Sequence, residues 1–227
     1  MIIKLIKILN IFLKKTLLGN YRQNKIANEI AKIIKKNELK KKIKILDFGS
    51  GFSEPSVISY LQELLKRNYD AKIYAADLFS KDFLKKKNMN YKNKIKYINS
   101  NKIIENNFDY CIISDVLHHI NYNLKKNKKV KKILLDLKKK SKHIIIKDHF
   151  EYNVFSRYLL RILDFLGNFQ YDVKIPHKYF TKKIFFKLLL DTNLKIVNIN
   201  TNISYYPKYF LFFNNKKMHF LTLLKSV

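Results

Sequence analysis

The chain has little glycine, proline, cysteine and arginine, and it has no tryptophan. Its 227 residues include four glycines, three prolines and one cysteine. A single cysteine excludes an internal disulfide, which fits a reducing compartment such as the cytoplasm. That residue, Cys111, lies in the apolar run 108–113, so we interpret it as a buried structural thiol. Because glycine is so rare, Gly49 and Gly51 mark a backbone turn with special geometry.

Acidic residues are also scarce, with 17 against 47 lysines and arginines, which gives a formal net charge of +30. Such a charge is typical of proteins that bind nucleic acid or anionic membranes. However, only four of the 47 basic residues are arginine, the usual residue for contacting phosphates and base edges. We therefore interpret the charge as a solvated lysine surface and expect no nucleic-acid partner. The 47% hydrophobic content excludes a disordered chain.

No hydrophobic run is long enough to cross a membrane. Residues 2–18 are apolar, but Lys4, Lys7, Lys14 and Lys15 interrupt them before the roughly 20 residues that a bilayer requires. At helical spacing these lysines share one face, which predicts a basic amphipathic helix. Such a helix either docks on its own domain or makes peripheral contact with a membrane, and both alternatives stay open.

Apolar strands alternate with amphipathic helices along the middle of the chain. Because alternation of this kind is typical of a parallel sheet with right-handed crossovers, we expect an α/β fold. The expected strands are 44–48, 71–76, 95–98, 108–114, 142–147, 194–200 and 218–224, and the expected helices are 53–67, 124–140 and 181–191. A lysine-rich stretch at 34–44 predicts a boundary between an N-terminal helical cap, 1–40, and the main domain, 41–227.

The strongest local signal is the segment Asp47-Phe-Gly-Ser-Gly51, which follows an apolar strand and precedes a helix. Glycines there let the backbone turn sharply and approach a ligand held at the helix N-terminus. A dinucleotide site needs a third glycine where this chain has Glu54, whose carboxylate would repel a pyrophosphate. The pattern therefore excludes NAD, and no Gly-Lys-Ser/Thr sequence indicates a nucleoside triphosphate.

Two motifs resemble those of the class I S-adenosylmethionine-dependent methyltransferases. Asp47-Phe-Gly-Ser-Gly51 is similar to the family's motif I, with Ser53 in place of its last glycine. The segment Asp115-Val-Leu-His-His119, at the end of the expected fourth strand, resembles motif IV. The resemblance implies an enzyme that uses S-adenosylmethionine. It also implies a Rossmann-like sheet of about seven strands, mostly parallel with a reversed last strand, and helices on both faces.

The resemblance further implies which residues bind the cofactor. Asp77 stands where the family's second-strand carboxylate accepts hydrogen bonds from both ribose hydroxyls. Asn99 stands where many members place an aspartate for the adenine amine, and its side-chain carbonyl can also accept. The expected cofactor-binding residues are Asp47, Gly49, Ser50, Gly51, Asp77, Leu78, Asn99 and Asp115.

The acceptor side is expected where Lys147-Asp148-His149 follows the fifth strand, because ligands bind at the carboxyl edge of such sheets. We take Asp148 and His149 as catalytic candidates for acceptor positioning or proton removal; alternatively, Asp148 caps a helix and His149 packs. Segments 164–171 and 176–179 resemble an acceptor-side region of the family. The expected substrate-binding residues are His118, Tyr171 and Tyr179.

The abundant aromatics after residue 150 suit a small-molecule or lipid-like acceptor, although a core and lid need them equally. A non-enzymatic, degenerate Rossmann-like binding module and an RNA methyltransferase are the alternatives. The intact Asp47, Gly49, Gly51 and Asp77 argue against degeneration, and only the charge favours RNA. We expect no metal site, because His118, His143 and the residues 148–149 lack a metal-ligand spacing.

Overall fold

A computed structural model describes residues 18–50, 57–77, 95–99, 103, 107–120, 127–168, 173–207 and 215–226. The strands are β1 (Lys42–Phe48), β2 (Asp70–Asp77), β3 (Ile95–Asn99), β4 (Phe108–Ser114), β5 (Ser141–His149), β6 (Leu194–Asn200) and β7 (His219–Ser226). The helices are α2 (Leu18–Asn37), α3 (Val57–Leu65), α5 (Leu117–Ile120), α6 (Lys128–Lys140), α7 (Val154–Asn168), α8 (Lys182–Asp191) and the 3-10 turn η3 (Lys216–Met218).

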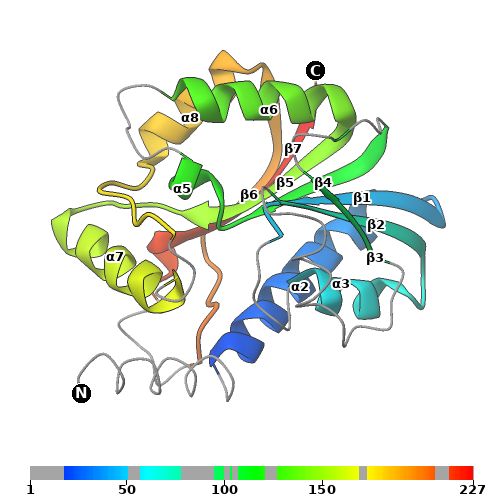
Figure 1. Ribbon diagram of the computed structural model, residues 1–227, viewed down its shortest axis with the longest axis horizontal. Coiled ribbons are helices and arrows are strands. Elements are labelled where there is room, and N and C mark those ends of the chain that lie inside the picture. Colours follow the sequence, from blue (N-terminus) through cyan, green and yellow to red (C-terminus); the bar gives the residue numbers. More distant parts are fainter. Residues whose placement is uncertain are drawn as a thin grey trace.

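One seven-stranded sheet forms the centre of the molecule, in the order β3-β2-β1-β4-β5-β7-β6 (Figure 1). The ladders from β3 to β5 are parallel, and β7 runs antiparallel to both of its neighbours. The expected α/β, Rossmann-like sheet with a reversed last strand is therefore confirmed. Six strands point their carboxyl ends toward the same edge, and that edge is where the candidate site lies.

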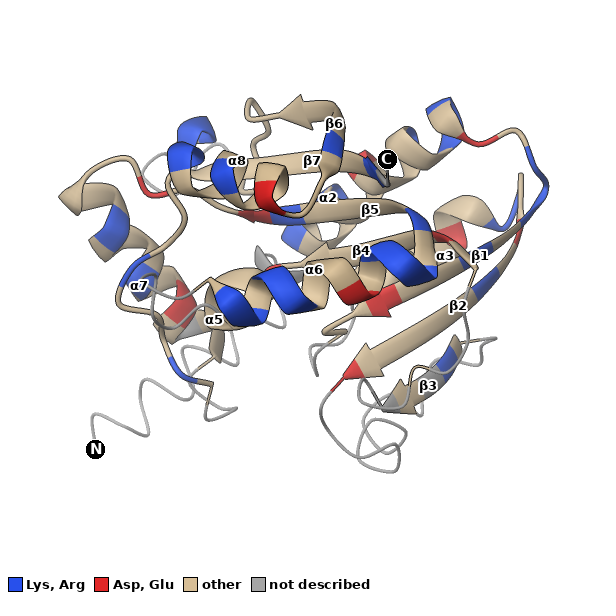
Figure 2. Ribbon diagram, turned by 90° about the horizontal axis from the view of Figure 1, so that it is seen from above, with Lys and Arg blue, Asp and Glu red and all other residues tan. Residues whose placement is uncertain are grey.

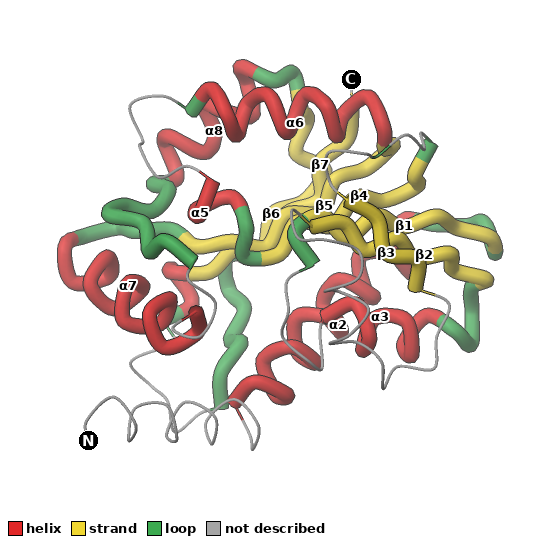
Figure 3. Tube along the Cα trace, viewed as in Figure 1, coloured by secondary structure: helices red, strands yellow, loops and turns green. Residues whose placement is uncertain are grey.

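Helices cover both faces of the sheet, with α6 and α8 on one side and α2 and α3 on the other (Figures 1 and 3). Leu46 and Ile144 pack in the core cluster under α6 and α8, whereas Ile45 and Ile145 pack in the cluster under α2 and α3. Because successive side chains enter opposite cores, the middle of a central strand is apolar at consecutive positions, as at Ile144–Ile146 of β5.

The N-terminal cap is represented by α2, which packs against α3 and the sheet. Its Ile26, Ile30 and Ile34 recur every four residues on one face and are fully buried. Residues 1–17 lie outside the described part, and so does the predicted amphipathic helix. Among the described helices, none combines the length and apolar character that a membrane span requires. The boundary at residue 40 stays a prediction.

The fifth strand is longer than expected. We expected it to end at Lys147, with Asp148 and His149 following, but β5 continues to His149. All three residues pair with β7, in the register Lys147↔Leu221, Asp148↔Phe220 and His149↔His219. The expectation was wrong because polar residues were taken to end a buried strand. These three residues are instead buried within the strand.

Helix α7 was not among the expected elements, and it lies beyond the carboxyl end of β5 (Figure 1). It begins at a side-chain cap, in which the Ser156 backbone N–H donates to Asn153 Oδ1 at 2.8 Å and the Asn153 N–H donates to Ser156 Oγ at 3.0 Å. Its aromatic residues are not core residues, because Phe155 and Tyr158 are about three-fifths exposed. The aromatic segment therefore divides between core and surface.

The lysine surface is clearest on α6. This helix buries Val130, Leu134 and Leu137 against the sheet, and its basic residues lie along the outside (Figure 2). Ion pairs to these lysines are few in the described residues, so most of the charge is solvated. This pattern agrees with the interpretation of the net charge as a general surface property.

Candidate functional site

The turn after β1 requires glycine at position 49 for two reasons. Gly49 has φ +79°, in the left-handed region that disfavours other residues. A Cβ added there would lie 2.4 Å from Val116 Cγ2, which is far inside van der Waals contact. The Gly49 and Ser50 N–H groups donate to the Ala76 carbonyl at 2.7 and 3.2 Å. The turn thus holds the ends of β1, β2 and β4 together, while Gly51 lies outside the described residues.

Two carboxylates flank this turn at the ends of adjacent parallel strands. Asp47 and Asp77 are 5% and 8% exposed. Burial, and secondarily the charge of Asp77, raise the pKa of Asp47 to about 7. Within the described part of the chain, Ser50 Oγ is buried without a hydrogen-bond partner. A ligand that brings positive charge and hydroxyl donors fits these groups.

Two other expected cofactor residues are only partly placed. Asn99 is the last residue of β3 and pairs in register with Asp77, so its backbone lies at the expected strand end. Leu78 follows directly after β2 but lies outside the described residues. Both therefore stay predictions as cofactor contacts.

Asp115 lies at the centre of a charged cluster at the ends of β4 and β5. Its carboxylate forms ion pairs with Arg22 from α2 and Lys147 from β5, and His149 Nε2 lies 3.0 Å from its Oδ1. Burial alone would raise the pKa of Asp115, but Arg22, Lys147 and His149 together hold it well below its ordinary value. Burial, and then Arg22, lower the pKa of Lys147 to about 8. The expected cofactor residue Asp115 is thus largely engaged by the protein itself.

His149 uses both ring nitrogens inside this cluster. Its Nδ1 lies 3.0 Å from His219 Nδ1, in addition to the contact between Nε2 and Asp115. Burial, and then the charge of Lys147, lower its pKa, so the ring is neutral near pH 7. A neutral imidazole has one donor and one acceptor, so Nε2–H donates to Asp115 and Nδ1 accepts from His219. In this arrangement neither nitrogen is open to remove a proton from a substrate.

A second buried network surrounds His118. Its Nδ1 lies 2.5 Å from Asp148 Oδ1, and its Nε2 makes an ion-pair contact of 3.3 Å with Asp164 Oδ2. The Tyr179 hydroxyl donates to Asp164 at 2.5 Å. Burial alone would lower the pKa of His118, but Asp148 and Asp164 raise it to about 10, so the ring is an imidazolium. Expected substrate-binding residues His118 and Tyr179 are therefore brought together, at 1% and 0% exposure.

Asp148 belongs to this second network rather than to an open cleft. It is fully buried, and besides His118 Nδ1 it accepts the His149 backbone N–H at 2.8 Å. Adjacent residues of a strand point to opposite sides. The two expected catalytic residues, Asp148 and His149, accordingly serve two different clusters, and the expected acceptor residue Tyr171 lies outside the described part.

Three residues that build the site were not among the predicted site residues, although Asp164 is the first residue of the acceptor-side segment 164–171. Arg22 reaches Asp115 from α2, Asp164 reaches His118 from α7, and Glu151 anchors α7. Glu151 accepts from Arg157 Nε and Nη2, both at 2.9 Å, and from the Tyr179 backbone N–H at 2.9 Å. The Asn153-x-x-Ser156 cap before an amphipathic pattern was a signal that could have located α7.

Possible metal ligands also meet in the second network. Nitrogen and oxygen atoms of His118, Asp148 and His149 lie within 4.8 Å of one another, as do those of His118, His119 and Asp164. The direct contact between His118 and Asp148 occupies the space that an ion would need, because metal ligands stand about 2 Å from the metal. We interpret both groups as hydrogen-bonded networks.

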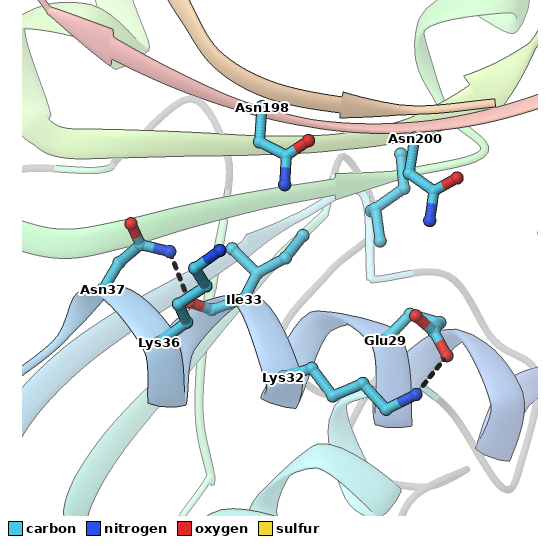
Figure 4. A pocket seen from close by; sticks show the side chains of 8 residues that line it. Glu29, Lys32, Ile33, Lys36, Asn37, Asn198 and Asn200 are labelled. Carbon is cyan, nitrogen blue, oxygen red and sulfur yellow. Dashed lines mark hydrogen bonds and ion pairs between the residues drawn. The ribbon is translucent and has the colours of Figure 1, made fainter. Parts of the chain in front are cut away.

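A shallow groove lies away from these clusters, between α2 and the β6–β7 side of the sheet (Figure 4). Three of its polar side chains make hydrogen bonds within the lining. Lys32 Nζ donates to Glu29 at 2.8 Å, and Asn37 Nδ2 donates to the Ile33 carbonyl at 2.7 Å. The groove therefore offers a solvated surface and no evident chemistry. Its lining residues are Glu29, Lys32, Ile33, Lys36, Asn37, Asn198, Asn200 and Leu221.

Solved structures share this architecture. An S-adenosylmethionine-dependent methyltransferase from Clostridium acetobutylicum matches with a TM-score of 0.58 and 15% identity, over 97% of this chain and 98% of that one. LepI in complex with S-adenosylmethionine matches with a TM-score of 0.59 and 12% identity. The chain has the class I methyltransferase fold.

The methyltransferase fold is also shared by the mitomycin 7-O-methyltransferase MmcR, at a TM-score of 0.54 and 12% identity. The match with LepI covers 86% of this chain but only 46% of LepI. The match with MmcR covers 88% of this chain but only 54% of MmcR. Neither a protein-family model nor a curated protein sequence matches the chain. At identities this low, what is shared is the fold.

Proposed function

We propose that the protein is an S-adenosylmethionine-dependent methyltransferase. The observation that carries the proposal is the arrangement of Asp47 and Asp77 around the Gly49 turn, at the carboxyl ends of adjacent strands in a methyltransferase fold. This is the edge at which open α/β sheets bind ligands.

The residues present fit that cofactor. Asp77 accepts hydrogen bonds from the ribose hydroxyls, and Asp47 pairs with the ammonium group of the amino-acid portion. Ser50 Oγ, buried without a partner among the described residues, gains one. Gly51, Leu78, Asn99 and Asp115 complete the proposed set. Bound S-adenosylmethionine supplies an electrophilic methyl group carried by a sulfonium.

The chain's own contribution is to position the acceptor. Arg22 and Asp115 are the polar groups of the β4–β5 end that retain some exposure, with side chains 19% and 20% accessible. His149 contacts Asp115 from the interior, and Asp148, His118 and Tyr179 form the neighbouring buried network. Fixing the acceptor in line with the methyl group is the main source of rate enhancement in such a displacement.

We further propose a small-molecule or lipid-like acceptor and a cytoplasmic location. The free Cys111 is buried in β4, and burial raises the pKa of its thiol well above its ordinary value, so it acts as an inert structural thiol. Peripheral membrane contact through residues 1–18 stays a proposal that rests on the sequence alone. Only the charge favours RNA, and the scarcity of arginine argues against it.

Titration calorimetry of the full chain with S-adenosylhomocysteine tests the cofactor, and transfer of labelled methyl groups to small-molecule, lipid and RNA pools tests the reaction. We expect binding in the micromolar range and transfer to a small-molecule or lipid pool. Absence of binding by the wild-type protein contradicts the proposal. Binding without transfer to any pool supports the non-enzymatic module instead, and transfer to RNA alone contradicts the acceptor class.

A further inference from the structure

The cluster around Asp115 carries more positive than negative charge. Its single carboxylate faces two cations, Arg22 and Lys147, while His149 is neutral. The neighbouring His118 network has the opposite balance, because one imidazolium lies between Asp148 and Asp164. The net charges of the two clusters cancel, but the surplus positive charge lies around Asp115 and the surplus negative charge lies around His118.

The two clusters also differ in access to solvent. The side chains of His118 and Asp148 are fully buried and that of Asp164 is 10% exposed. In the positive cluster Lys147 is fully buried as well, but Arg22 and Asp115 are each about one-fifth exposed. A ligand that reaches the carboxyl ends of β4 and β5 therefore meets Arg22 and Asp115 first, with Lys147 behind them, and not the negative cluster.

Two polar atoms of the positive cluster have no hydrogen-bond partner among the described residues. They are Arg22 Nε and the Tyr205 hydroxyl, and Tyr205 is fully buried. The Tyr205 ring lies 5.0 Å from Lys147 Nζ, so the hydroxyl belongs to the same cluster. An arginine Nε–H can only donate, and a tyrosine hydroxyl can donate. A group rich in hydrogen-bond acceptors suits these donors, and a negatively charged one suits the surplus charge.

We propose that Arg22, Lys147 and Tyr205 form a subsite for an oxyanion, a carboxylate or a phenolate. The subsite adjoins the glycine turn, because Asp115 is followed by Val116, whose side chain packs against Gly49. The oxyanion belongs either to an acidic acceptor or to the carboxylate of the cofactor's amino-acid portion. The assignment to one of these two sources rests on the proposed methyltransferase function.

For an acidic acceptor, the subsite explains why no side chain needs to act as a base. The acceptor oxygen is already an anion, stabilised by Arg22 and Lys147. Its lone pair forms the new oxygen–carbon bond while the carbon–sulfur bond breaks and its electron pair stays on sulfur. One negative and one positive charge disappear, the products are an ester or ether and a thioether, and no proton moves. His149 and Asp148 are then free to remain in their internal contacts.

The first arm of the test uses 4-nitrophenol with the full-length protein, since the phenolate and the phenol differ in absorbance. At a pH below the pKa of the probe, the wild-type protein should increase the phenolate absorbance in a saturable way. Arg22→Gln and Lys147→Met should weaken binding at least tenfold. The exposed residues Arg67 and Lys66 provide matched controls, because Arg67→Gln and Lys66→Met remove the same charges elsewhere. Circular dichroism checks that each variant is folded.

The second arm compares S-adenosylhomocysteine with 5′-methylthioadenosine, which lacks the amino-acid carboxylate. If Arg22→Gln weakens binding of S-adenosylhomocysteine alone, the cofactor supplies the oxyanion. If it weakens binding of the nitrophenolate alone, the acceptor supplies it. Equal affinities of the variant and wild type in both arms overturn the subsite, and Arg22→Gln decides this even if Lys147→Met does not fold. Failure of the wild type to bind S-adenosylhomocysteine contradicts the methyltransferase proposal and leaves the nitrophenolate arm as the test of the subsite.

Discussion

The carboxyl edge of the sheet has two halves, and the pKa of a buried aspartate is shifted in opposite directions in the two. On the β1–β2 side, burial and Asp77 raise the pKa of Asp47 to about 7. On the β4–β5 side, Asp115 is buried as well, but Arg22 and Lys147 hold its pKa well below its ordinary value. Although β1 and β4 are adjacent strands, the carboxylates near their carboxyl ends differ because, of the two, only Asp115 forms ion pairs with cations among the described residues.

This difference separates the two halves chemically. The β1–β2 half offers negative charge and hydrogen-bond acceptors, which suit a ligand with an ammonium group and hydroxyls. The β4–β5 half offers positive charge and donors, which suit an oxyanion. Two reactants of opposite character would therefore be directed to neighbouring positions. The following variants test each half in turn.

The largest effect is expected for the ribose contact of the β1–β2 half. On the proposed cofactor site, Asp77→Ala would remove two hydrogen bonds to a charged acceptor, each contributing about 1.5–3 kcal/mol to binding. The affinity for S-adenosylhomocysteine should fall at least a hundredfold by titration calorimetry. Asp70, at the exposed amino end of the same strand, is the matched control. If Asp77→Ala binds S-adenosylhomocysteine with unchanged affinity, this carboxylate does not contact the cofactor.

The buried network behind the β4–β5 half should show the next largest effect. Replacing His118 with glutamine leaves Asp148 and Asp164 buried without their cation, at a cost of about 3–5 kcal/mol in the free energy of unfolding. The pKa of His118 is raised from 6.5 to about 10, so its contribution is complete below pH 6.5 and declines as the pH rises toward 10.

Denaturant unfolding between pH 6 and pH 10 checks this prediction. The wild-type protein should lose stability over that range, and His118→Gln should be less stable but show a flatter profile. His177→Gln is the control, because His177 is exposed. Parallel pH profiles for wild type and His118→Gln would argue that this histidine is not an imidazolium in the folded state.

A somewhat smaller effect is expected at the turn that joins the two halves. Gly49→Ala places a Cβ 2.4 Å from Val116 Cγ2 at φ +79°, and the combined steric cost is about 2–5 kcal/mol. Thermal unfolding should show a clear decrease in melting temperature. Gly167→Ala is the matched control, since no atom lies within 4 Å of its added Cβ. Equal melting temperatures for the two variants would contradict the described turn.

The smallest effect concerns Asp47, whose pKa is raised by burial and by the charge of Asp77. Its folded-state pKa of about 7 exceeds the ordinary 3.8, so the native state retains the proton longer and stability falls as the pH rises from 3.8 to 7. Asp47→Asn should abolish this decline and stabilise the ligand-free protein by about 1–3 kcal/mol above pH 7. Chemical denaturation at pH 5 and pH 8 measures the difference. A loss of stability at pH 8 would mean that a cation compensates Asp47.

The strands and the glycine turn could be predicted from sequence because local patterns encode them. The run Phe108–Ser114 is apolar at most positions, with Asp109 as its one charged residue, and β4 has those bounds. Likewise, Asp77 ends β2, as expected from the carboxylate that closes the apolar segment. Hydrophobic periodicity and rare glycines act over a few residues, so they can be recognised without knowing the topology.

The partners of the site residues could not be predicted, because the topology sets them. Arg22 and Asp115 are 93 residues apart in the chain, and nothing near Arg22 indicates its partner. Lys147 and Asp148 were expected at the end of a strand, since isolated charges rarely continue into a core. Their burial becomes understandable only when Asp115 and His118 are placed beside them.

The position of β7 has a consequence for biosynthesis. This strand lies between β5 and β6, although it follows both along the chain. While a ribosome is still adding residues before His219, Lys147 and His149 lack the neighbouring strand that encloses them, and β6 has no ladder to join. The β1–β4 half can therefore form during translation, whereas the half with the charged clusters assembles only after β7 has emerged. A nascent chain paused at that stage would leave the β5 edge beside Lys147 and His149 without its pairing strand, and open strand edges favour aggregation.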